Sequence, residues 1–406
     1  LPSGQPVIVN ADGTVSVIAE TDVSQSVGTS TSFYSSNTQE ITSVYDSNAQ
    51  RVVVVYSDPN NSDYGTAVVG TVSGTSISFG TAVVFNSAAS SAITAVYDSS
   101  EQKVVLAYQD TGNSFRGTSI VGTVSGTSIS FGSEATFITA TVSQLNATYD
   151  VNASKVVIAF REGALPRSGK AVVGTVSGTS ISFGSPSTFD SNSVREPRPV
   201  YDAGSQKIVI VYKDTGNSSY GEAVVGTVSG TSISFGSPVV FNSANSEAFG
   251  VAYDANAQKV VIAYRDDGNS DYGTAIVGTV SGTSISFGTA VVFQAISSEG
   301  FSATFDASSN TVVIAYREGS SGLGYVIQGT VSGTSISFAT RLLYQNNGVD
   351  YISIVYASAS EKSVISYRSY ANNYGTSIVY TGASTLTNLT SENYIGIAKG
   401  AAADGT

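Results

Sequence analysis

The chain has 406 residues, with 18 Lys or Arg against 30 Asp or Glu, so its net charge is −12 at pH 7. This balance argues against nucleic acid and anionic membrane surfaces as partners. Cys, His, Met and Trp are absent, which excludes disulfides, thiolate or imidazole metal sites and every Ser-His or Cys-His nucleophile. We therefore predict no cofactor and no metal site. No run of 18 apolar residues occurs, so we expect no membrane insertion.

Residues 1–26 form the first predicted segment. Two apolar runs within Val7–Ile18 flank Asp12-Gly13, a dipeptide typical of a two-residue hairpin turn. A lone hairpin is only marginally stable in water. We therefore expect this N-terminal β extension to dock either on the rest of the chain or on another molecule.

From residue 27 onward the chain is dominated by a repeat. The decapeptide GTVSGTSISF occurs six times at spacings of 52, 52, 52, 52 and 51 residues, beginning at Gly70, Gly122, Gly174, Gly226, Gly278 and Gly329. So regular a period means that one supersecondary unit is repeated many times.

One unit, residues 91–141, shows the expected strands. Residues 92–98 are extended, and the apolar, β-branched run 103–108 follows after a polar turn. Residues 118–124 and 127–131 then form a hairpin, with Ser125-Gly126 predicted as its two-residue connection. Each repeat of about 52 residues thus supplies four antiparallel strands. A small residue recurs in the second strand, which indicates close packing between sheets: Ala107, Ala159, Ala263 and Ala315.

Four strands per repeat without a helix predict an all-β fold, a seven-bladed β-propeller, over residues 27–389. A stacked β-solenoid is the competing interpretation, although its coils are usually shorter. The count of seven comes from the Tyr-Asp-like first strand, which recurs seven times against six decapeptides. Residues 27–33 resemble residues 79–85, the end of a repeat, so we expect one terminus to complete the blade begun by the other. Residues 390–406 are then a C-terminal β extension.

Polar loops after the second strand are the first candidate sites. The loops beginning at Asp58, Asp214 and Asp266 offer oxygen atoms that Ca²⁺ could use. None has the spacing of a Ca²⁺-binding loop, so we favour turns held by Asx-type hydrogen bonds.

A second candidate is one repeat position that is basic in five consecutive repeats: Arg161, Lys213, Arg265, Arg317 and Arg368. These side chains could face an anionic ligand around one side of the ring. Alternatively, they pair with the acid that follows in four of them: Glu162, Asp214, Asp266 and Glu318. We favour the second interpretation, in which the pairs are solvated and contribute little.

The third candidate is the region where the repeat breaks. The third repeat replaces its usual loop with residues 163–170, the fourth opens with residues 195–199, and seven of the 18 basic residues fall between Arg116 and Arg198. Departures from a repeat are where a specific contact is most readily built, while neutral drift is the alternative. The predicted binding surface comprises Arg161, Arg167, Lys170, Arg195 and Arg198.

Glycosylation is a further prediction, contingent on the host. Five Asn-x-Ser/Thr sequons begin at Asn60, Asn146, Asn152, Asn217 and Asn388.

The repeats resemble those of a known group of proteins. The run TAVVGTVSGTSISFGTAVVF, the segment 253–266, the opening VIVNADGTVSV and the closing segment 389–398 are similar to seven-bladed propeller proteins of aquatic phages and uncultured aquatic microbes. The resemblance implies a surface, tail-fibre or extracellular-filament protein. It supplies no catalytic residues.

Two functions follow, and both place the protein outside the cell, on a cell surface or on a virion. The first is a structural subunit that assembles head-to-tail with itself through its terminal segments, which we expect at opposite ends of a closed ring, by strand addition. The residues predicted to mediate this assembly are Val7, Ile8, Val9, Val15, Val17, Ile18, Tyr394, Ile395 and Ile397. The second is a glycan- or receptor-binding adhesin of a phage tail fibre. An enzyme ranks third, because a paired carboxylate site is not apparent.

Overall fold

The structure is a computed structural model, and it describes residues 6–10, 12–18, 20–387 and 396–397. Most of these residues lie in β-strands, and the described part of the chain contains no α-helix, only the short 3-10 turns η1 (Pro59–Asn61) and η2 (Asp267–Asn269). The prediction of an all-β fold is confirmed. Within the same residues, no helix has the length and apolar character that crossing a membrane requires.

Seven strands that begin the successive repeats line the centre of the molecule. They are β6 (Gln39–Asp46), β10 (Val83–Asp98), β14 (Ala135–Asp150), β19 (Val194–Asp202), β23 (Val239–Asp254), β27 (Val291–Asp306) and β31 (Leu342–Ala357).

The second and third strands of the repeats follow in chain order. The second strands are β7 (Arg51–Asp58), β11 (Lys103–Asp110), β15 (Lys155–Glu162), β20 (Lys207–Asp214), β24 (Lys259–Asp266), β28 (Thr311–Glu318) and β32 (Lys362–Ser369). The third are β8 (Tyr64–Ser73), β12 (Arg116–Ser125), β16 (Gly169–Ser177), β21 (Tyr220–Ser229), β25 (Tyr272–Ser281), β29 (Leu323–Ser332) and β33 (Tyr374–Thr381).

Short strands lie at the outer edge and in the terminal segments. The outer ones are β4 (Ser26–Val27), β5 (Thr31–Asn37), β9 (Ser76–Phe79), β13 (Ser128–Phe131), β17 (Ser180–Phe183), β18 (Ser187–Asp190), β22 (Ser232–Phe235), β26 (Ser284–Phe287) and β30 (Ser335–Phe338). The terminal ones are β1 (Pro6–Val9), β2 (Val15–Val17), β3 (Glu20–Val23), β34 (Ser384–Thr387) and β35 (Gly396–Ile397).

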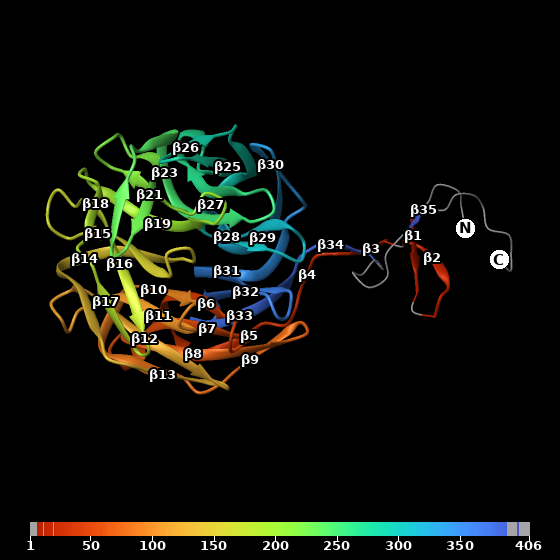
Figure 1. Cartoon of the computed structure of the whole chain (residues 1–406). Coiled ribbons are helices and arrows are strands. Elements are labelled where there is room, and N and C mark those ends of the chain that lie inside the picture. Colours follow the sequence, from red (N-terminus) through yellow and green to blue (C-terminus); the bar gives the residue numbers. More distant parts are fainter. Residues whose placement is uncertain (1–5, 11, 19, 388–395, 398–406) are drawn as a thin grey trace.

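Each repeat is an antiparallel meander. In the first repeat β6 pairs with β7, β7 pairs with β8, and β8 pairs with both β9 and the beginning of β10. The same β10 then continues as the first strand of the next repeat and pairs with β11. Figure 1 shows the result, because the chain colours run once around the molecule and bring the last repeat beside the first.

The tight hairpin of the repeated decapeptide differs by one residue from the prediction. Ser125 pairs with Ser128, so Gly126 and Thr127 are the two turn residues in place of Ser125 and Gly126. Gly126 has φ +61°. A turn that requires positive φ at its first central position selects glycine there, which sets the register of both strands.

The recurrent Tyr-Asp pair closes the next turn and links neighbouring repeats. Asp98 is 1% exposed, and its Oδ1 accepts the backbone N–H groups of Ser100 (2.9 Å) and Glu101 (3.1 Å). The hydroxyl of Tyr149, from the following repeat, accepts the same N–H of Ser100 at 3.3 Å. The motif is therefore structural, because aspartate holds the turn and tyrosine connects it to the adjacent sheet.

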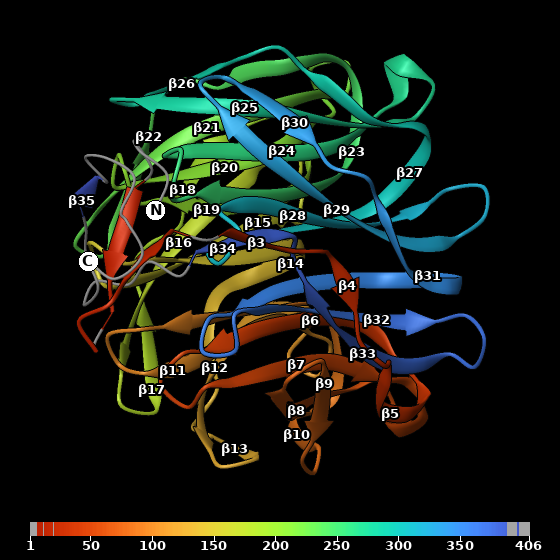
Figure 2. The same ribbon diagram turned by 90° about the vertical axis from the view of Figure 1, so that its right-hand side faces the viewer.

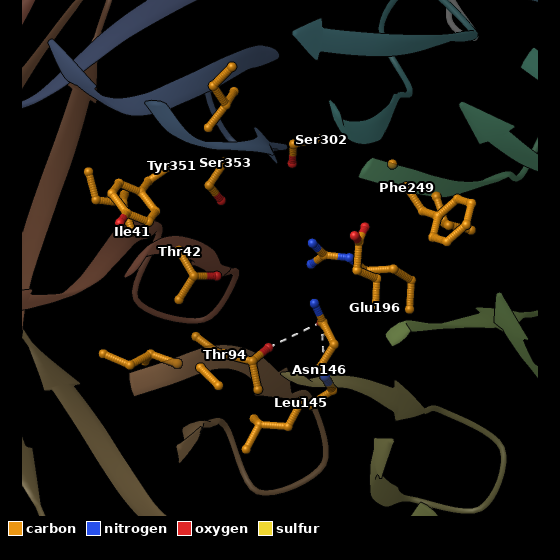
Figure 3. A pocket seen from close by; sticks show the side chains of 18 of the residues that line it. Ile41, Thr42, Thr94, Leu145, Asn146, Glu196, Phe249, Ser302, Tyr351 and Ser353 are labelled. Atoms are coloured by element: carbon orange, nitrogen blue, oxygen red, sulfur yellow. Dashed lines mark hydrogen bonds between the residues drawn. The ribbon is translucent and has the colours of Figure 1, made fainter. Parts of the chain in front are cut away.

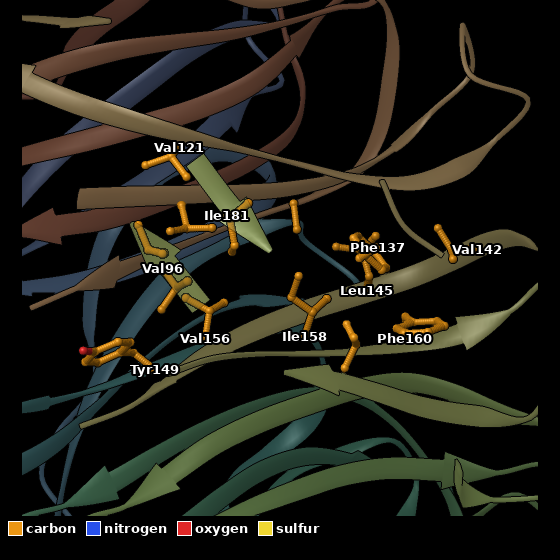
Figure 4. Close-up of a cluster of buried hydrophobic side chains, with 14 residues drawn as sticks. Val96, Val121, Phe137, Val142, Leu145, Tyr149, Val156, Ile158, Phe160 and Ile181 are labelled. Carbon is orange, nitrogen blue, oxygen red and sulfur yellow. The ribbon is translucent and has the colours of Figure 1, made fainter. Parts of the chain in front are cut away.

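Apolar packing joins each repeat to the next. Seven buried clusters each combine side chains from two consecutive repeats. Figure 4 shows one of them, in which Val96 and Val121 of the second repeat meet Phe137, Ile158 and Phe160. The recurrent small residue lies in these layers: Ala107, Ala159, Ala263 and Ala315 are at most 1% exposed.

The first and last repeats are joined as the sequence predicted. Strand β33 pairs with β4 through Tyr380 and Val27, and with β5 through residues 374–377 and 31–37. A Cβ atom on Gly28 would lie 1.7 Å from the carbonyl oxygen of Thr75, so only glycine allows this close approach. The N-terminal segment thus supplies the outer strands that the seventh repeat lacks.

The two terminal segments do not lie at opposite ends of the ring, which corrects the basis of the predicted head-to-tail contact. Strand β3 pairs with β34, and β1 pairs with both β2 and β35. Because the chain enters and leaves the ring through the same repeat, the two ends emerge side by side, as Figures 1 and 2 show.

Candidate functional site

A cavity of about 900 Å³ occupies the centre of the molecule. Seven segments line it, one from the first strand of each repeat: residues 40–43, 91–95, 143–148, 196–200, 249–251, 300–304 and 350–355. Its lining combines hydroxyl, amide, carboxylate and guanidinium groups with a few aromatic rings. Figure 3 shows Thr94, Asn146, Glu196 and Ser302 around this space, with Phe249 to one side, near Glu196, and Tyr351 on the other, near Ile41.

A β-bulge recurs at one end of this lining. The residue at the bulge has positive φ in every repeat: Glu40, Ala92, Gln144, Glu196, Ala248, Gly300 and Tyr351. Two of the polar side chains at this position, Gln144 and Glu196, reach the next bulge. The backbone N–H of Glu196 donates to Gln144 Oε1 at 3.3 Å, and that of Ala248 donates to Glu196 Oε2 at 2.8 Å. These bulges could not be predicted from the sequence, because glycine, the residue that would mark a positive φ, occupies the position only once, as Gly300.

Charged side chains in the cavity are mostly acidic. Glu40, Glu196 and Asp350 line it together with one basic residue, Arg198. Burial raises the pKa of Glu40, and burial lowers the pKa of Arg198 although Glu196 and Glu40 oppose that shift. Arg198 Nε is buried and has no hydrogen-bond partner among the residues that the structure describes. The cavity therefore offers both charge signs and unsatisfied donors to a polar molecule.

The basic repeat position lies next to this end of the cavity. Arg265, Arg317 and Arg368 stand opposite Glu247, Glu299 and Asp350 in the strand register. Their ion pairs are 2.7, 2.7 and 2.8 Å long. Lys213 pairs with Glu247 at 2.6 Å. The prediction that each base pairs with the acid that follows it is wrong, because consecutive residues in a strand point to opposite faces.

Arg161 departs from this pattern. Its register partner is Ser143, and it makes no ion pair or side-chain hydrogen bond with the described residues. It is 9% exposed, and its Nε atom is buried without a partner. Burial lowers the pKa of Arg161, and the nearby charges of Arg167 and Arg195 lower it further. We call Arg161, Arg167 and Arg195 the arginine cluster.

The five residues of the predicted binding surface therefore do not form a single group. Arg161, Arg167 and Arg195 lie together, whereas Lys170 pairs with Glu162 at 2.9 Å and Arg198 lines the cavity. The cluster lies beside the cavity, because Ser143, the register partner of Arg161, and Glu196, which follows Arg195 in the sequence, both line it. The binding surface stays a prediction.

The three polar loops form the expected turns. Asp58, Asp214 and Asp266 each accept a backbone N–H two residues ahead, at 3.0, 2.7 and 3.1 Å. Asp214 also belongs to an acidic cluster with Asp190 and Glu222, whose oxygen atoms lie within 4.8 Å of one another. Burial raises the pKa of both Asp190 and Glu222. Three such oxygen ligands match the chemistry of a hard cation.

The remaining predicted residues have varied positions. Val7 and Ile8 are buried in the small terminal sheet, while Val9 and Val15 are each 45% exposed and Val17 pairs with Val7. Ile18 is half-buried outside these strands, and Ile397 pairs with Pro6. Tyr394, Ile395 and Asn388 lie outside the described residues. Asn60, Asn152 and Asn217 are exposed, whereas Asn146 lines the cavity, which disfavours glycosylation there.

Comparison with known proteins gives likenesses of fold. No family model and no curated protein matches the chain. It is similar to the BP39L lectin from Burkholderia pseudomallei, with TM-score 0.61 and 9% identity over 88% of this chain and 99% of that one. It is also similar to a protein of unknown function from Dyadobacter fermentans, with TM-score 0.51 and 10% identity over 89% and 99% of the two chains. At these identities the likeness shows the fold alone.

Proposed function

We propose that the protein is a seven-bladed β-propeller that binds a carbohydrate at its central cavity, without catalysing a reaction on it. The observation that carries the proposal is the cavity itself. Its volume of about 900 Å³ suits a small ligand, and every repeat contributes to its wall. The seven meanders and the seven inter-repeat clusters support the count of blades.

The chemistry of the lining favours a sugar. Thr94 Oγ1 donates to Asn146 Oδ1 at 3.2 Å, and that oxygen also accepts the backbone N–H of Ala147. The Asn146 amide nitrogen keeps its donors for a ligand. Hydroxyl, amide and carboxylate groups can satisfy the hydroxyls of a saccharide, and Tyr351 adds an aromatic surface.

The fold comparison adds support of a general kind. One of the similar structures is named a lectin, and it is matched over 99% of its length. A binding protein of this type fits the predicted setting outside the cell or on a virion, which we retain as part of the proposal. The adhesin hypothesis is consistent with it, and a phage origin remains a prediction.

The filament hypothesis receives less support. It required terminal segments on opposite sides of the ring, whereas β1, β2 and β35 form one sheet within the chain. Strand addition between copies therefore stays a prediction, and no contact among the described residues supports it.

A glycan array tests the proposed function. We expect the folded chain to bind at least one saccharide, and Asn146→Ala to weaken that binding by about fivefold through loss of a hydrogen-bonding group. Asn152→Ala, an exposed asparagine in the following turn, is the matched control and should leave binding unchanged. Failure to bind any neutral or acidic glycan at millimolar concentration would contradict the proposal.

A further inference from the structure

We propose that the arginine cluster is a subsite for the carboxylate or sulfate group of an acidic saccharide. The inference rests on the proposed function and narrows its ligand class. A buried arginine that binds no acid among the described residues lies beside two exposed arginines, next to residues that line a polar cavity.

The repeats themselves show what is missing around Arg161. Lys213 reaches Glu247 of the next repeat, and Arg317 approaches Asp350 of the next repeat at 3.9 Å. A basic side chain at this position therefore faces the following repeat, at the residue directly before its bulge. We call that residue the rim residue. For Arg161 that rim residue is Arg195, which is basic where the three later repeats have an acid: Glu247, Glu299 and Asp350.

Nearby acids do not neutralise the cluster. Glu162 accepts Lys170 Nζ at 2.9 Å and Ser168 Oγ at 3.2 Å, and Glu196 accepts the backbone N–H of Ala248. A buried charge is costly unless it is paired and hydrogen-bonded. Arg161 and its two like-charged neighbours therefore leave a place where an anion would be stabilised.

The backbone holds the cluster in place. The carbonyl oxygen of Arg167 accepts the backbone N–H of Val194 at 3.2 Å, which fastens the loop of the third repeat to the strand that carries Arg195. Arg161 itself lies within β15, paired in register with Gly169 of β16. Two of the three guanidinium groups thus come from strands, and the third comes from a loop tied to one of them.

The guanidinium geometry selects the class of ligand. Its planar fork donates two parallel hydrogen bonds to a carboxylate or a sulfate. An anion bound here would direct the rest of its molecule toward Ser143 and Glu196, where sugar hydroxyls find partners. The net charge of −12 repels long polyanions, so we infer a single acidic sugar or the end of a chain as the ligand.

Calorimetric titration with four compounds tests the subsite: sodium glucuronate, glucose 6-sulfate, glucose and inorganic sulfate. We expect at least one acidic sugar to bind about tenfold tighter than glucose, and Arg161→Gln to remove that advantage. Arg265→Gln makes the same change of charge at the same repeat position and should preserve it. The stronger of the two acidic sugars identifies carboxylate or sulfate as the preferred group.

Other results separate this inference from the proposed function. Acidic and neutral sugars binding equally, or equal losses in both variants, would overturn the subsite and leave carbohydrate binding intact. Inorganic sulfate bound through Arg161 with no sugar bound would support an anion site and overturn the carbohydrate assignment. Arg195→Gln, at an exposed position, gives the same readout if Arg161→Gln does not fold.

Discussion

The basic position at the end of the second strand has two different surroundings in one ring. In the last three repeats Arg265, Arg317 and Arg368 each bind a carboxylate across the strand pair, at 2.7 to 2.8 Å. In the third repeat Arg161 stands opposite Ser143 and beside Arg195 and Arg167, with no acid bound to it.

The backbone pairing is the same in both regions. In each, the register between the first and second strands shifts at the bulge, between Ser143 and Asn146 in the third repeat and between Glu247 and Gly250 in the fifth. Two replacements therefore separate a closed ion pair from an open cationic site: Ser143 stands where the later repeats have an acid across the strand pair, and Arg195 stands where the following repeat would supply one. A repeat protein can create a binding site in this way without altering its fold, at some cost in stability.

The largest expected effect comes from removing a carboxylate in the region where the basic residues form ion pairs. Glu247 accepts both Lys213 and Arg265, and Lys213 has a side chain that is 8% exposed. Glu247→Gln should lower the free energy of unfolding by about 2 kcal/mol, because it leaves the buried Lys213 without its acid and removes one of the two carboxylates that bind Arg265, the other being Asp267. Urea unfolding measures the loss. Glu361→Gln, at an exposed turn residue that forms no ion pair with the described residues, is the control, and an equal loss of stability in both variants would contradict the comparison.

Supplying an acid next to Arg161 should change the free energy of unfolding by a smaller amount and in the opposite direction. Arg195→Glu restores the acid of the later repeats and gives Arg161 a partner. We expect the free energy of unfolding to rise by about 1 kcal/mol, since a charge-assisted pair replaces a like-charge contact. Thermal melts of the variant and the parent provide the measurement. A lower melting temperature would mean that Arg161 already has a counter-charge.

A third expected effect concerns the acidic cluster formed by Asp190, Asp214 and Glu222. Burial raises the pKa of Glu222 in the folded protein, so the folded state holds its proton more tightly than the unfolded chain does. Its contribution to stability is present below about pH 4 and is lost as pH rises through the folded pKa. Glu222→Gln should remove this loss and stabilise the protein at pH 7 by up to about 1 kcal/mol. Stability profiles from pH 4 to 7 that coincide for parent and variant would refute this.

Much of the architecture could be predicted from the sequence because it depends on local and repeated signals. Gly126 marks the hairpin, and the Tyr-Asp pair marks the first strand. The likeness of residues 27–33 to residues 79–85 predicted the junction between the last and first repeats. The turn was still displaced by one residue, because Ser-Gly and Gly-Thr are equally plausible until the strand register is known.

The site could be predicted only in part. The repeat break identified Arg161, Arg167 and Arg195, yet it also included Lys170 and Arg198, because sequence distance does not tell which side chains share a face. Pairing was misjudged for the same reason, since Glu247 is 18 residues from Arg265. The cavity and the bulges that form its rim depend on seven strands meeting in space, which no single repeat encodes.

The most direct test is a crystal structure of the protein soaked with the acidic sugar that binds best in titration. The account predicts its carboxylate or sulfate within hydrogen-bond distance of the Arg161 guanidinium, with the sugar ring extending into the cavity toward Asn146. Density for the sugar at the outer strands, or an arginine cluster left empty at saturating ligand, would contradict it.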